Sequence, residues 1–149
     1  MEKIFEVQRI KQVIKENEYG MDIKKICSPS DAANIAVKFI GDEDREVFLV
    51  LCLNTKNEVV GAHRCHIGSI DSSIVHPREV YKSAILNNSR SIIVAHNHPS
   101  YELTPSREDI EVTKRLVEAG RILGIELLDH LIVNGKGQSV SLKEKGYIL

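Results

Sequence analysis

The segment VFLVLCL, residues 47–53, limits the fold more than any other part of the sequence. Successive side chains of a strand point to opposite faces, so an uninterrupted apolar run of this length predicts a strand that is covered on both faces. A turn-forming stretch at residues 54–57 follows directly, and residues 58–67 are typical of the returning strand of a hairpin. We therefore expect a central sheet that needs cover on two sides.

Helical and strand patterns follow one another along the rest of the chain. Apolar spacing, with capping residues at the ends, predicts helices over residues 4–17, 29–40, 77–88 and 106–123. Further strands are expected at residues 91–96, 125–133 and 138–141. This order predicts an α/β fold, with a mixed central β-sheet flanked by helices. We interpret the first helix as a cover for the sheet or as a homodimer contact.

The composition is that of an ordinary soluble domain, and the 149 residues have the length of one domain. A formal net charge of −1 gives no sign of a nucleic-acid partner or an anionic membrane. No apolar run approaches the length of a membrane span, and the charged N-terminus does not fit a secretory signal. The three cysteines are widely spaced and odd in number, which indicates reduced thiols in a cytoplasmic protein.

Two histidines follow the apolar strand expected at residues 91–96. His96 and His98 lie two residues apart, so their side chains point to the same side of the strand, and Pro99 turns the chain out of the sheet. A helix begins again at Ser106, with Asp109 in its first turn. This loop length lets the carboxylate fold back toward the imidazoles. Two histidines and one carboxylate, with water in a fourth position, are the ligands of a catalytic zinc site.

Another interpretation of the same residues is a simple helix start. The pattern Ser106-x-x-Asp109 fits a capping box, with Asp109 near the positive end of the helix dipole. Each pattern alone is common, but His-x-His and Ser-x-x-Asp at this spacing should coincide by chance in on the order of one in a thousand such chains. Ser106 can cap the helix beside a metal ion, whereas we expect Asp109 less readily to cap and to ligate at once.

The spacing of His96, His98, Pro99, Ser106 and Asp109 is similar to the JAMM metalloprotease signature of the JAB/MPN+ group. The wider sequence resembles the bacterial RadC family, in the segments VHPRE (75–79), HNHPS (96–100), PSRED (105–109) and LDHLI (128–132). The resemblance covers roughly residues 27–149 and leaves residues 1–26 as an N-terminal helical extension. It implies a JAB/MPN-like fold of three α/β/α layers, like that of cytidine deaminases.

The resemblance also implies an activity and a role for each residue. His96, His98 and Asp109 would hold Zn²⁺, Glu46 would hold the attacking water and carry its proton to the leaving amine, and Ser106 would steady the oxyanion. The implied reaction is hydrolysis of a peptide or isopeptide bond, with a peptide or protein as substrate. The alternatives are a DNA-repair accessory protein or nuclease of the RadC family, which the composition does not support, and a metal-free scaffold.

Several residues leave alternatives open. Tyr101 stands where RadC-like chains commonly carry glycine, so the loop either bends differently or places this ring in the substrate cleft. Residues 1–26 show no helix-hairpin-helix pattern, which removes the most obvious surface for DNA. Asp129 and His130 lie in an apolar strand, where they satisfy backbone groups or each other, or support the metal from behind. We interpret His63, two residues before Cys65, as a solvent-facing strand residue.

Overall fold

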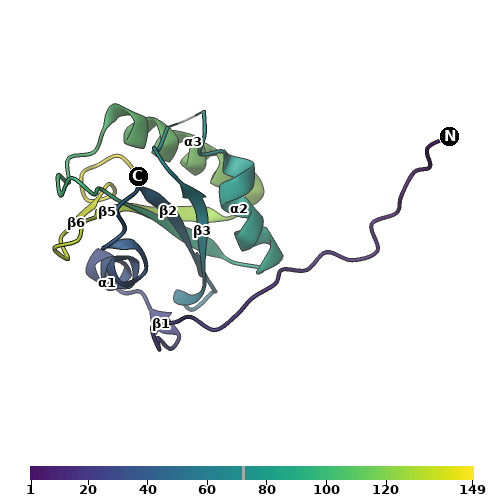
Figure 1. The fold of residues 1–149 in the computed structure, drawn as a ribbon, viewed down its shortest axis with the longest axis horizontal. Helices are drawn as coiled ribbons and strands as arrows, with labels where there is room; N and C mark the ends of the chain where they lie inside the picture. Colours follow the sequence, from purple (N-terminus) through teal and green to yellow (C-terminus); the bar gives the residue numbers. More distant parts are fainter. Residues whose placement is uncertain (72) are drawn as a thin grey trace.

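The computed structural model describes residues 1–71 and 73–149. The described chain forms the helices α1 (Pro29–Ile40), α2 (Pro77–Leu86) and α3 (Arg107–Leu123). Its strands are β1 (Lys24–Lys25), β2 (Val47–Leu53), β3 (Glu58–Ile67), β4 (Ser91–Asn97), β5 (Glu126–Val133) and β6 (Ser139–Ser141). They make one six-stranded sheet in the order β1-β3-β2-β4-β5-β6 (Figure 1). Strand β1 has no counterpart in the sequence prediction, because its two lysines carry no strand pattern.

The sheet is mixed. Strands β4 and β5 run parallel and are joined through α3, whereas the other neighbouring strands are antiparallel. Helix α1 packs on one face of the sheet, and α2 and α3 cover the other (Figure 1). The predicted α/β fold, with a mixed sheet between helices, is therefore confirmed.

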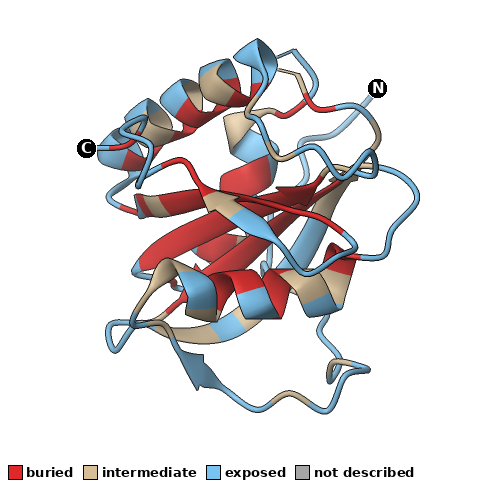
Figure 2. Ribbon diagram, turned by 90° about the vertical axis from the view of Figure 1, so that its left-hand side faces the viewer, coloured by how far each residue is buried: buried red, intermediate tan, exposed pale blue. Residues whose placement is uncertain are grey.

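Strand β2 separates two hydrophobic cores. Phe48 and Val50 face the core below α2 and α3, while Leu49 and Leu51 face the core below α1. Each of these four side chains is fully buried, and Figure 2 shows the buried strands lying between helices whose outer faces are exposed. Burying a side chain of this size contributes roughly 1.5–3 kcal/mol, so the alternation along β2 anchors both layers.

The helix predicted over residues 4–17 is absent, since the described chain has no helix before Pro29. The apolar side chains of this segment are between 71% and 102% exposed: Ile4, Phe5, Val7, Ile10, Val13 and Ile14. Figure 1 shows the N-terminal part of this segment running away from the sheet, while residues 12–17 line a cavity beside β3 and α2. An isolated helix of about 14 residues is marginal in water without packing, which explains why the amphipathic pattern alone is insufficient. The division at residues 26 and 27 stays a prediction.

None of the helices in the described part of the chain has both the length and the apolar character that a bilayer span requires.

Candidate metal centre

The structure brings His96, His98 and Asp109 together at the end of β4. His96 Nε2 lies 3.1 Å from Asp109 Oδ1, and His98 Nε2 lies 3.4 Å from Asp109 Oδ2. The two imidazole Nε2 atoms are 2.9 Å apart. One ligand atom from each residue lies within 4.8 Å of the other two, so the group could hold a metal ion. Among the described residues, no other group of three such side chains has this geometry.

The end of β4 directs these side chains. His96 faces the core below α2 and α3, where its ring stacks on Phe48 at 6.4 Å between centroids. Asn97 points to the opposite face and accepts a 2.7 Å hydrogen bond from the backbone of Val47. The backbone N–H of His98 donates to Val133 on β5, so both histidines are held by neighbouring strands. This alternation is the reason why two imidazoles share one side of the sheet.

Asp109 lies in the first turn of α3 and makes contacts on two sides. Its Oδ2 accepts a 2.8 Å hydrogen bond from the Ser106 backbone, and its own backbone donates to Ser106 Oγ at 3.0 Å, which completes a capping box. The same carboxylate faces both histidines. The capping role of Asp109 is therefore confirmed, and its two oxygens, which offer about four acceptor positions, leave room for a ligand role that stays a prediction.

The electrostatics of the site favour an ionised Asp109 carboxylate beside the two imidazoles. Burial opposes ionisation of Asp109, but the contacts of its carboxylate with His96 and His98 outweigh this effect and hold the pKa of this carboxyl well below its usual range. The hydrogen bond to Asp109 raises the pKa of His98, although burial acts in the opposite direction. A proton on His98 is thus favoured wherever no cation stands between the rings, and a metal ion has to displace it.

A further histidine, left open by the sequence, lies directly behind His96. His130 on β5 is fully buried, and its Nε2 is 2.8 Å from His96 Nδ1. Its Nδ1 is 2.6 Å from Thr113 Oγ1, and this hydroxyl donates to the backbone carbonyl of Asp109 at 2.7 Å. Burial lowers the pKa of His130 well below its usual value.

Asp129, the neighbour of His130, has a separate role. Its carboxylate accepts hydrogen bonds from the Ser141 hydroxyl at 2.6 Å and from the backbone of His130 at 2.7 Å. The two open alternatives for this pair therefore divide between its members. Asp129 satisfies local groups, while His130 contacts a ligand candidate. A histidine in an apolar strand indicates that it has a hydrogen-bonding partner. Which residue is that partner depends on how α3 crosses the sheet.

Glu46 immediately precedes β2 and is partly buried. Its Oε2 accepts a 3.0 Å hydrogen bond from the backbone of Ile70, which fixes the carboxylate beside the loop after β3. The negative charge of Glu46 is one of the minor contributions that raise the pKa of His98, so this carboxylate acts on the same site. Ser106 is exposed, and its hydroxyl oxygen caps α3.

The model of the RadC-like JAB domain matches residues 26–147. The chain belongs to this family. The UPF0758 protein YsxA of Bacillus subtilis is 49% identical over 145 residues, covering 92% of this chain and 62% of YsxA. The UPF0758 protein TTE0897 of Caldanaerobacter subterraneus is 54% identical over 122 residues, covering 82% of this chain and 52% of the relative.

The resemblance to the RadC family is thereby confirmed. A third relative, a UPF0758 protein of the archaeon Methanosarcina barkeri, is 48% identical over 125 residues and is covered to 54% of its length. The chain thus spans between about half and two thirds of the length of these relatives.

In this RadC-like JAB domain, Tyr101 differs from the expected loop in its side chain but not in its backbone bend. The residue has a φ of 69°, in the left-handed region that glycine adopts more readily, so the backbone keeps a glycine-like bend despite the side chain. The Asn134 side chain donates to the Tyr101 carbonyl at 3.1 Å. Tyr101 also lines a cavity of about 310 Å³, together with Pro99 and the acidic stretch at residues 42–44. The ring therefore lies beside the loop that carries His98.

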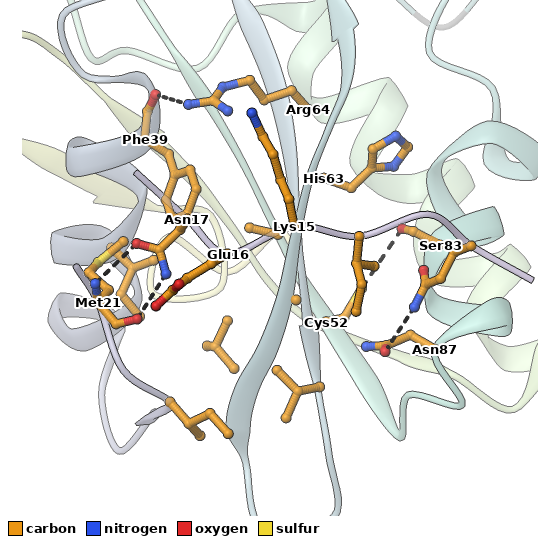
Figure 3. Close-up of a pocket in the computed structure, with 18 of the residues that line it drawn as sticks. Lys15, Glu16, Asn17, Met21, Phe39, Cys52, His63, Arg64, Ser83 and Asn87 are labelled. Carbon is orange, nitrogen blue, oxygen red and sulfur yellow. Dashed lines mark hydrogen bonds between the residues drawn. The ribbon is translucent and has the colours of Figure 1, made fainter. Parts of the chain in front are cut away.

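A larger cavity, of about 620 Å³, lies away from His96 and His98. Figure 3 shows it between residues 12–24, strand β3 and helix α2, with His63 and Arg64 among its lining. Neither His96, His98, Asp109 nor Glu46 contributes to it. His63 is exposed, as predicted, and takes no part in the candidate metal centre.

Proposed function

We propose that this chain is a zinc-dependent hydrolase of the JAMM type, which cleaves a peptide or isopeptide bond. The observation that carries the proposal is the convergence of two imidazole Nε2 atoms and one ionised carboxylate at the end of β4. Three protein ligands of this kind leave a coordination position open, as catalytic zinc sites do. Bound zinc would supply a Lewis acid at this position.

The donor set fits the ion in two respects. Both imidazoles have their Nδ1 atoms engaged elsewhere, His96 with His130 and His98 with the Glu102 carbonyl at 2.5 Å, so both Nε2 atoms turn toward Asp109. The Asp109 carboxylate is ionised, as a ligand has to be. The same set also suits iron(II) in some enzymes, and the choice of zinc rests on the resemblance to JAMM proteases.

Glu46 is the proposed general base. The carboxylate is held through Oε2 by the Ile70 backbone, and Oε1 has no hydrogen bond within the described part of the chain. In this role Oε1 takes a proton from the attacking water and delivers it to the leaving amine. A carboxylate fixed at one oxygen and free at the other can do this without losing its position.

Ser106 is the proposed stabiliser of the oxyanion. Its hydroxyl oxygen accepts from the Asp109 backbone, so the hydroxyl proton itself is free to be donated. A donor held at a helix N-terminus, where the dipole favours negative charge, suits an oxyanion that forms on the substrate carbonyl. The expected partner is therefore a peptide or protein.

The proposal is tested by metal analysis combined with a substrate screen. The purified chain is expected to hold close to one equivalent of zinc, and to cleave members of an unbiased peptide and isopeptide library. Glu46→Gln should abolish cleavage while zinc content stays unchanged, because the carboxylate is not among the three ligands. Glu43→Gln, a nearby exposed acid, is the matched control. Cleavage of DNA but of no peptide would support the alternative nuclease role and refute the proposal.

A further inference from the structure

We propose that Thr113 and His130 form a relay of hydrogen bonds that fixes the tautomer of His96 and so presents a bare Nε2 to the metal. Thr113 and His130 are positioning residues, which act on the metal only through His96. The inference rests on the proposed metal site for its consequence, but the direction of the relay can be tested without any metal.

The relay begins at the backbone of Asp109. A carbonyl oxygen only accepts hydrogen bonds, so the Thr113 hydroxyl donates its single proton to it, as threonines in helices do to the residue four positions earlier. Thr113 Oγ1 therefore has to accept from its other neighbour, His130 Nδ1, at 2.6 Å. This contact places the proton of the neutral His130 ring on Nδ1.

The same reasoning carries the direction on to His96. With its proton on Nδ1, neutral His130 has a bare Nε2, which accepts from His96 Nδ1 at 2.8 Å. His130 is 0% exposed, and its two ring nitrogens contact a hydroxyl and an imidazole rather than a carboxylate, so the buried ring is neutral. His96 then has its own proton on Nδ1 and a bare Nε2, the atom that lies 3.1 Å from Asp109 Oδ1.

The relay closes a ring between the ligand candidates. It starts at the backbone of Asp109 on α3, crosses to β5 through His130, and ends at His96 on β4, whose Nε2 faces the side chain of Asp109. Thr113, His130 and His96 are each 0% exposed, so no water can substitute for a missing donor or acceptor. Loss of the Thr113 hydroxyl leaves His130 free to take the opposite tautomer, which would put a proton on the ligand atom of His96.

The first experiment reads the tautomers directly. Long-range ¹⁵N–¹H NMR of the metal-free protein distinguishes Nδ1–H from Nε2–H imidazoles. We expect the Nδ1–H form for His130 in the wild-type chain, and its loss or mixing in Thr113→Val. Thr113→Ser, which keeps the hydroxyl, should restore the wild-type form. A wild-type His130 protonated on Nε2 would overturn the inference, whatever the metal results are.

The second experiment measures zinc dissociation constants by competition with a chelator. Thr113→Val should weaken zinc binding by about 10–100-fold, the usual effect of removing a group behind a ligand, and Thr113→Ser by much less. Thr55→Val, an exposed threonine in the β2–β3 turn at the far end of the sheet, is the matched control. Wild-type affinity in folded Thr113→Val refutes the relay. Failure of the wild-type chain itself to bind zinc refutes the proposed function, and the NMR result still decides the tautomer.

Discussion

The change Asp109→Ala should separate the two roles of this carboxylate. It removes a partner of the capping box, a loss of about 0.5–2 kcal/mol. It also removes a charge-assisted contact to His98, worth about 1.5–3 kcal/mol. Because the effects overlap in one side chain, we expect a loss of about 2–3 kcal/mol in the free energy of unfolding without metal. For a chain of this length, this corresponds to about 4–12 °C in Tm.

The second measurement is the rise in Tm that zinc binding produces. Zinc at 100 times its Kd should stabilise the wild-type chain by about 2.7 kcal/mol. Asp109→Ala should show no zinc-dependent rise in Tm at the same concentration, since the ligand itself is gone. Glu108→Ala is the control, because this exposed acid lies in the same first turn of α3. An undiminished zinc shift in Asp109→Ala would show that the carboxylate only caps the helix.

Three further predictions concern other parts of the molecule. Cys27 is exposed, whereas burial raises the pKa of Cys65 to about 12, so a thiol reagent at pH 8 should label Cys27 rapidly and Cys65 only after denaturation; fast labelling of Cys65 would contradict the packing of β3. The raised pKa of His98 means that protons compete with zinc below that pKa, so the apparent Kd, measured across a pH series, should rise about tenfold per pH unit as the pH falls, and a flat profile would argue against His98 as a ligand. Removal of residues 2–11 should leave Tm and the helical circular-dichroism signal nearly unchanged, because these side chains are exposed and non-helical, and a clear loss of helix would restore the sequence prediction for this segment.

The sequence predicted those features whose causes are local. Seven apolar residues at 47–53 identify a central strand, because each face of a strand is read from alternate positions. The convergence of His96, His98 and Asp109 was also foreseeable, since a strand end, a short loop and a helix start leave little freedom between them. The prediction of a helix over residues 4–17 was wrong, because an amphipathic pattern forms a stable helix only where other parts of the protein pack against it.

Features set by tertiary packing could not be predicted from the sequence. The contact between His96 and His130 joins residues 34 positions apart, and depends on the parallel register of β4 and β5. Thr113 reaches His130 only because α3 crosses the sheet at a particular rotation. The contacts of Asp109 with both Ser106 and the histidines were hard to foresee for a different reason, since a sequence pattern counts a residue once although its carboxylate has two oxygens.

The parallel pair β4 and β5, with α3 between them, has a consequence for how the chain can be rebuilt. The three ligand candidates and both relay residues lie within residues 96–130, one continuous βαβ unit, while Glu46 alone comes from outside it. The proposed metal ligands and the proposed general base thus lie in separable stretches of polypeptide. A circular permutant that opens the chain in the 54–57 turn and joins the original ends would keep the three ligand candidates in one continuous stretch. It would test whether Glu46 still reaches its position when β2 lies at a chain end.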